Sequence, residues 1–259
     1  ELEKVLAEQP QHAEALHARG KVYAARGECE QAIPTLVEAS TQAQAQLSLQ
    51  QQTELFALLA ESQLACGKPN DAAGSRDNMR RLAGDIPLVR LLTARIALAR
   101  QDYGQAVAEL QRIVTDSPNY TPARVLLGAA LVAQGNLNQA EAQLVEVLQQ
   151  APENAEARKL LAQVRLRLQR PDAAIQALTE FGGASESDPQ VEALLDLAKL
   201  QREQPDSGGS PRDRQLSVAM ASLRAGDPDA ALSALNGVAR EQGDIRREAL
   251  MLAALSAAR

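Results

Sequence analysis

Small residues recur at a fixed interval along this chain. Ala106, Ala140 and Ala174 are 34 residues apart, and the same interval separates Pro118 from Pro152. A constant period of this length indicates stacked helical hairpins, because each hairpin buries its apolar face against its neighbours. We therefore expect an all-α chain, an α-solenoid of antiparallel helix pairs, with one pair in each period.

Two positions of the period carry a small residue in every unit. When units begin at residues 13, 53, 87, 121, 155, 212 and 246, these are position 8 and position 20. A larger side chain at either position would push the two helices of a pair apart, so both are predicted to be buried at the crossing. The residues are Gly20, Ala60, Ala94, Gly128, Ala162, Ala219 and Ala253 at position 8, and Ala32, Ala72, Ala106, Ala140, Ala174 and Ala231 at position 20.

Two local features depart from this regularity. Position 24 is usually large and apolar, but Arg76 occupies it in the unit that begins at Thr53, and we expect that pair to pack loosely. The unit that begins at Ala13 is longer than the others. Its surplus is the glutamine-rich stretch 41–52, which is expected to lengthen a helix or its connection.

The chain is predicted to have three parts. Residues 1–181 form a regular array with a partial repeat at 1–12 and repeats from 13, 53, 87, 121 and 155. Residues 182–211 contain Gly/Ser/Pro-rich loops around one helix at 190–203, and 212–259 form one repeat and a final unpaired helix. Because residues 1–9 and 246–259 each have the pattern of one helix without its partner, we expect a fragment of a longer protein.

The stretch from Thr121 to Asn154 resembles a tetratricopeptide (TPR) repeat. It has a small residue where the helices meet, an alanine in the second helix and a proline at the end of the unit. The resemblance implies a right-handed superhelix in which positions 2, 5, 9, 12 and 13 of each first helix line an inner groove. Mapped onto this chain, the predicted groove residues are Leu88, Leu91, Arg95, Leu98, Val125, Ala129, Val132, Lys159, Gln163 and Arg167.

An apolar stripe edged by positive charge favours a protein partner in this groove. An extended peptide or an amphipathic helix with apolar anchors and carboxylates would fit it. The sequence leaves two alternatives open. A flanking repeat or a loop of the chain itself covers the groove, or the exposed leucines are scattered and carry no function.

Three segments are similar to a narrower family, the TPR-repeat lipoproteins of exosortase (PEP-CTERM) and exopolysaccharide systems. They are 118–128, 157–168 and 170–175. That resemblance implies an outer-membrane-anchored lipoprotein that faces the periplasm and assists polysaccharide export or protein sorting.

No catalytic, cofactor or metal site is expected. His12 and His17 are the only histidines and lack nearby ligands at metal spacing, so a solvated or groove-lining role is favoured. Cys29 and Cys66 could pair in an oxidising compartment, but the spacing carries no motif and favours free thiols. The net charge of −6 argues against a nucleic-acid partner, and no apolar run is long enough to span a membrane.

These observations predict a non-catalytic protein-binding scaffold in the bacterial envelope, located in the periplasm. One alternative is a cytoplasmic TPR adaptor or regulatory domain of a larger protein. The other is direct binding of a polysaccharide, which usually needs an aromatic platform. It is ranked lower because the aromatic residues are not expected to form a stripe on the inner face; they are Tyr23, Phe56, Tyr103, Tyr120 and Phe181.

Overall fold

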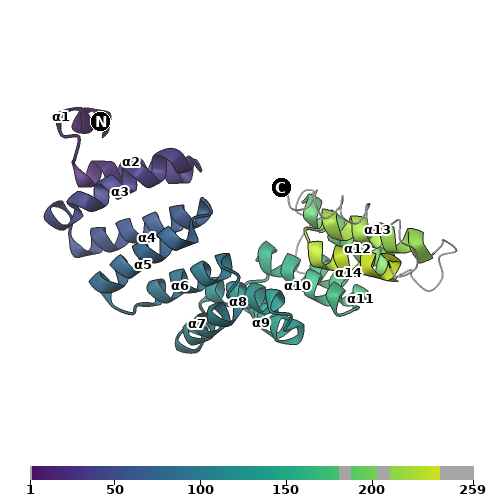
Figure 1. Cartoon of the computed structure of the whole chain (residues 1–259). Coiled ribbons are helices and arrows are strands. Elements are labelled where there is room, and N and C mark those ends of the chain that lie inside the picture. The colour runs from purple at the N-terminus through teal and green to yellow at the C-terminus, as the bar shows by residue number, and fades with distance from the viewer. Residues whose placement is uncertain (1, 181–187, 203–210, 240–259) are drawn as a thin grey trace. The chain divides into compact units, whose positions relative to one another are not determined.

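The described part of the chain consists of helices, and the helices from α1 to α11 are joined by short turns (Figure 1). This computed structural model describes residues 2–180, 188–202 and 211–239, which contain helices and turns and no strand. The expected all-α solenoid of helix pairs is confirmed. The chain divides into two compact units, residues 1–123 and 124–259, and each is described by itself below.

Unit 1 contains one leading helix and three helix pairs. The leading helix is α1 (Leu2–Glu8), and the pairs are α2 (Ala13–Ala25) with α3 (Cys29–Gln46), α4 (Leu49–Ala65) with α5 (Pro69–Ala83), and α6 (Pro87–Ala99) with α7 (Tyr103–Asp116). The surplus residues of the first pair lengthen both neighbouring helices. Helix α3 has 18 residues and α4 has 17, compared with 13 in α2.

Unit 2 begins within the first turn of α8 (Thr121–Ala133), which pairs with α9 (Leu137–Gln150). The other described helices are α10 (Ala155–Arg167), α11 (Pro171–Glu180), α12 (Pro189–Arg202), α13 (Pro211–Arg224) and α14 (Pro228–Ala239). The helix predicted at 190–203 is α12, and it packs against α10, α11 and α13. The expected loops at 182–187 and 205–210, and the final helix at 246–259, lie outside the described residues.

The small residues of the period lie where the two helices of a pair cross. Gly20 in α2 faces Leu36 in α3 so closely that a Cβ atom on the glycine would be 2.5 Å from Leu36 Cδ2. The equivalent distance from Gly128 to Leu144 Cδ2 is 2.8 Å. Ala140 is fully buried, as are most of the other small residues, and Ala253 lies outside the described residues. The predicted register is therefore confirmed.

The pair α4/α5 does not show the loose packing expected from Arg76. Ala60, Ala72 and Met79 are all fully buried. Arg76 extends to the next helix instead, where its Nη1 donates to Thr93 Oγ1 at 3.0 Å. The core of the pair is therefore filled by Met79, one turn further along α5, while the charged side chain leaves it.

The turn between the first and second helix of each pair has one residue in the left-handed conformation. Glycine occupies this place at Gly27, Gly67, Gly135 and Gly226, but the other two turns have Gln101 at φ 61° and Gln169 at φ 58°. A residue with a Cβ atom is strained there by about 1–2 kcal/mol. The turn geometry is thus imposed by helix packing even where the sequence does not favour it.

Cys29 and Cys66 form a disulfide, with Cα atoms 5.9 Å apart. The sequence-based expectation of free thiols is wrong, because stacking brings the start of α3 next to the end of α4 although the two residues are 37 positions apart. A cross-link that closes a loop of this length stabilises the fold by about 3–4 kcal/mol in the chain-entropy treatment.

The close contact at Gly20 predicts opposite effects for one substitution made at two sites. Gly20→Ala should lower the free energy of unfolding by about 1–3 kcal/mol, because the new methyl group overlaps Leu36. Gly74→Ala in α5 should raise it by about 0.5–1 kcal/mol, because no atom lies within 4 Å and alanine favours the helix. Urea denaturation followed by circular dichroism measures both, and changes of the same sign would contradict the assigned register.

Candidate partner-binding site

In unit 1 the predicted groove residues differ in how accessible they are. Leu88 at the start of α6 is 38% exposed, and Leu98 is partly exposed. Leu91 is buried in the core, so it cannot serve as an apolar anchor for a partner. Arg95 is partly exposed, and its Nη1 lies 2.7 Å from Glu61 Oε1. Glu61 occupies the same position as Arg95 in the preceding helical repeat. The accessible groove residues of α6 are thus two apolar side chains and one ion-paired arginine, and burial of Leu91 interrupts the expected apolar stripe.

In unit 2 the predicted groove begins with α8. Val125 is buried, while Ala129 and Val132 are partly exposed. Val125 therefore resembles Leu91. Both residues occupy the predicted helix positions, but packing against neighbouring helices shields them from solvent.

The polar groove residues of α10 bind other parts of the same unit. Lys159 Nζ lies 3.1 Å from Asp188 Oδ2, just before α12. Gln163 Nε2 donates to the backbone carbonyl of Ala225 at 3.1 Å. This face of α10 is therefore covered by the chain itself, which is one of the alternatives that the sequence left open.

Arg167, at the end of α10, makes the strongest of these contacts. Its Nε donates to Asp227 Oδ2 at 2.7 Å, and a second nitrogen contacts the other oxygen of the same carboxylate. Asp229 is a more distant and exposed partner at 3.5 Å. The hydrogen bond to Asp227 raises the pKa of Arg167 above its ordinary value, so the guanidinium stays charged. This planar, bidentate contact requires the guanidinium group of an arginine, and a lysine could not reproduce it.

The pKa of Asp188 is shifted in the opposite direction from that of Arg167. Its pKa is lowered, first by the hydrogen bond from Lys159 and then by the backbone N–H of Gln190. Sequence reasoning missed Asp188, Asp227 and Asp229 as partners, because each lies in or beside a turn and carries no pattern that indicates a distant cation.

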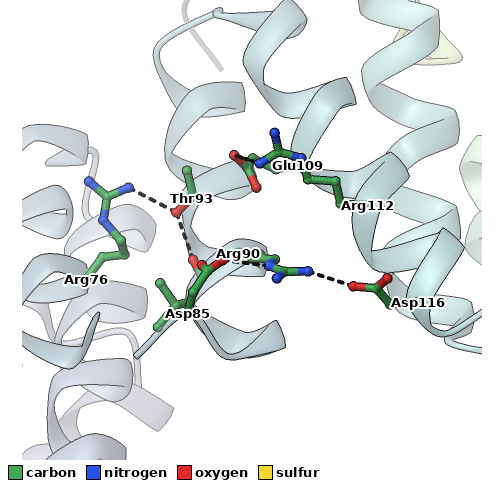
Figure 2. A network of polar contacts seen from close by, with 8 residues as sticks. Arg76, Asp85, Arg90, Thr93, Glu109, Arg112 and Asp116 are labelled. Carbon is green, nitrogen blue, oxygen red and sulfur yellow. Dashed lines mark hydrogen bonds and ion pairs between the residues drawn. The ribbon is translucent and has the colours of Figure 1, made fainter. Parts of the chain in front are cut away.

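A second polar network connects the ends of the helices α5 to α7 in unit 1. Figure 2 shows Arg90 between two carboxylates, with Nε 3.1 Å from Asp85 Oδ2 and Nη1 2.7 Å from Asp116 Oδ2. The hydrogen bond to Asp85 is the main cause of the raised pKa of Arg90. Because this network joins the turn before α6 to the end of α7, it has a structural role in fixing helix ends. Arginine recurs at this position as Arg90, Arg124 and Arg158, a signal that sequence reasoning did not use.

The described residues suggest neither a metal centre nor a membrane span. Residues 2–180, 188–202 and 211–239 hold no group of three or more His, Cys, Asp or Glu side chains placed to bind a metal. Among the helices of these ranges, none combines the length and the hydropathy of a membrane-spanning segment.

Two family models of the tetratricopeptide repeat match the sequence, one over residues 97–147 and the other over residues 125–189. The chain carries tetratricopeptide repeats. TPR proteins are generally scaffolds for protein–protein interaction, and this TPR chain has the helix pairs and the small crossing residues of such a scaffold.

Solved structures share this TPR fold at low sequence identity. The apo form of RapI matches with a TM-score of 0.66 and 11% identity, covering 93% of this chain and 81% of that one. A TPR protein of Parabacteroides merdae matches with a TM-score of 0.60 and 15% identity, covering 95% and 99%. PilF of Pseudomonas aeruginosa matches with a TM-score of 0.55 and 16% identity, covering 93% and 97%. No curated protein sequence is recognisably similar.

The two histidines have different roles in the first TPR of unit 1. His12 caps helix α2, because its Nδ1 accepts a hydrogen bond from the backbone N–H of Ala15 at 3.3 Å. His17 is partly buried on α2 at one of the inner-face positions. Burial lowers its pKa from the ordinary value of 6.5, Lys21 lowers it further, and Glu54 and Glu14 oppose the shift.

This shift predicts how stability depends on pH. Below pH 6.5 the unfolded chain binds a proton at His17 more readily than the folded chain does. The free energy of unfolding should therefore fall as the pH falls from 6.5 through the pKa of the folded state. Urea denaturation between pH 7.5 and pH 5 should show a smaller slope for His17→Gln. An unchanged slope in His17→Gln would contradict the assignment.

Proposed function

We propose that this TPR chain is a non-catalytic scaffold, and that unit 1 holds an extended segment of a partner protein against its first helices. The observation that carries the proposal is the contrast between the predicted groove residues of α6 and the polar ones of α10. Leu88 is exposed and Arg95 forms an exposed ion pair with Glu61, whereas Lys159, Gln163 and Arg167 of α10 bind groups that lie farther along the chain.

The chemistry of the partner follows from these side chains. Leu88 offers an apolar contact, and the ion pair of Glu61 with Arg95 is exposed enough that a partner can exchange with it. Such an exposed pair contributes little stability, about 0–1 kcal/mol, so separating it costs little. A peptide carrying an apolar anchor and a nearby carboxylate would satisfy Leu88 and Arg95 together.

Photo-crosslinking tests this site directly. A p-benzoylphenylalanine side chain at position 88 should capture a discrete partner in cells that produce the protein. Arg95→Glu should reduce the yield about tenfold, since it replaces attraction for a carboxylate by repulsion. Val37 on α3 is 43% exposed and is a matched control position outside the predicted groove. Equal capture from positions 37 and 88 would rule out this face as the binding site.

The proposed setting is the bacterial envelope, in exopolysaccharide export or PEP-CTERM protein sorting. Two observations support it, namely the resemblance of residues 118–128, 157–168 and 170–175 to TPR lipoproteins of those systems and the disulfide between Cys29 and Cys66. Structural disulfides persist in oxidising compartments such as the periplasm and are rare in the cytosol. A cytoplasmic adaptor remains the alternative to be tested. Direct polysaccharide binding is not favoured, because Tyr120 is the one aromatic among the large exposed apolar side chains of the described residues.

The redox state of the two cysteines in intact cells distinguishes these settings. After acid quenching and treatment with a maleimide of high mass, the protein should run at its unmodified size, because both thiols are in the disulfide. Reduction before treatment should shift it by two additions. Full modification without prior reduction would contradict an oxidising compartment and favour the cytoplasmic adaptor. The Cys29→Ser variant has one thiol and should gain one maleimide, so it marks the gel position of the singly modified protein.

A further inference from the structure

Unit 2 contains a cavity of about 420 Å³ between helices α10, α12, α13 and α14. Its apolar side is formed by Leu166, Leu194, Leu197 and Val218. This volume falls in the range of small-molecule sites, which are mostly apolar with a few polar groups that fix the ligand. The cavity lies within unit 2 and does not include the proposed partner site of unit 1.

Two polar atoms in the cavity wall lack a hydrogen-bond partner. Ser222 on α13 is 1% exposed, and its Oγ has no partner. Gln201 at the end of α12 has an Oε1 that is equally shielded and unpaired. A buried polar group without a partner costs about 1–3 kcal/mol. Both residues line the cavity, and rotation of either side chain would bring its polar atom to an occupant of the cavity.

Ser222 differs from other hydroxyl side chains of this protein. A serine or threonine inside a helix commonly donates to the carbonyl four residues earlier. Ser62 donates to the carbonyl of Leu58 in this way, and Thr93 donates to that of Val89, both at 2.8 Å. The hydroxyl of Ser222 makes no such bond to Val218, so no helix hydrogen bond would be broken when the side chain turns toward a ligand.

The charged side chains at the rim of the cavity disfavour an anionic ligand. Arg167 is held by Asp227, and Asp229 adds a second carboxylate whose side chain is 77% exposed. One guanidinium against two carboxylates gives a local net negative charge. The free oxygen of Gln201 is also an acceptor, so the complementary ligand donates hydrogen bonds and is neutral or cationic.

We propose that this cavity binds a small amphiphile with a compact apolar body and a hydrogen-bond-donating amine or hydroxyl group. The apolar body would pack on the leucines, a donor would reach Gln201 Oε1, and the hydroxyl of Ser222 would complete the contact. The amine end would lie toward Asp229. This assignment is independent of the partner site on unit 1, because no residue is shared between them.

Tyramine is a suitable probe, since it carries an amine and a phenol on one aromatic ring. Saturation-transfer NMR on the whole chain should detect its binding, and its presence should raise the melting temperature. The matched control is 3-(4-hydroxyphenyl)propionate, which has a similar body with a carboxylate in place of the amine. It should bind at least about tenfold more weakly, because the rim repels anions.

Ser222→Ala separates a binding role from a structural one. Without ligand it should be as stable as the parent or more stable, since it removes an unpaired hydroxyl. Its affinity for tyramine should nevertheless fall about tenfold, the equivalent of one hydrogen bond to a buried group. Ser62→Ala is the matched control, because its hydroxyl is already paired and lies outside the cavity, and its affinity should be unchanged.

Three results would overturn the proposal. The first is that neither probe binds the folded chain, and the second is that Ser222→Ala binds tyramine as tightly as the parent. The third is a crystal grown with tyramine that shows only ordered water bonded to Ser222 Oγ. Ala230→Leu, which places a larger side chain into the cavity wall, provides a second variant if Ser222→Ala does not fold. Loss of tyramine binding in the folded Ala230→Leu protein would support the cavity as the site, and retention would contradict it.

Discussion

The absence of a side chain at Gly20 and Gly128 is the constraint on which the structure of each unit depends. Leu36 and Leu144 fill the space that a Cβ atom would occupy, so the two helices of a pair approach until leucine meets backbone. Because packing is dense, the distance between the helices fixes which side chains of the first helix remain outside the core. Leu91 and Leu92 lie inside it, and Leu88 remains exposed on the same helix.

Much of the fold could be predicted from the sequence, because a 34-residue period constrains every unit in the same way. The starts of α2, α6, α8 and α10 were predicted, and the alanines at position 20 that the structure describes are buried as expected. Arg76 was misjudged, since the period shows which position a residue occupies but not where a long side chain extends. Met79 compensates for it, and no periodic pattern indicates such a compensation.

The candidate site was less predictable, for a physical reason. Groove positions follow from the register of one helix, whereas accessibility depends on what other elements cover that helix. Asp188 and Asp227 lie 29 and 60 residues from their partners Lys159 and Arg167. Asp188 comes from the region where the period is interrupted, and Asp227 comes from the repeat that follows that region. Once formed, the contact between Arg167 and Asp227 is costly to separate, because Asp227 is only 6% exposed and would be left buried without its cation. This face of α10 therefore belongs to the stable structure of unit 2.

The disulfide also has a mechanical consequence. A solenoid that is pulled from its ends can lengthen by unravelling one helix pair after another, because each pair contacts mainly its neighbours. Cys29 and Cys66 are covalently joined, so the chain between them cannot contribute to that extension. The chain enclosed between the two cysteines would span about 120 Å if extended, at roughly 3.4 Å for each residue. Under load, tension would pass from Cys29 to Cys66 through the single sulfur bridge and bypass the long helices α3 and α4, so only the chain outside the bridge could lengthen.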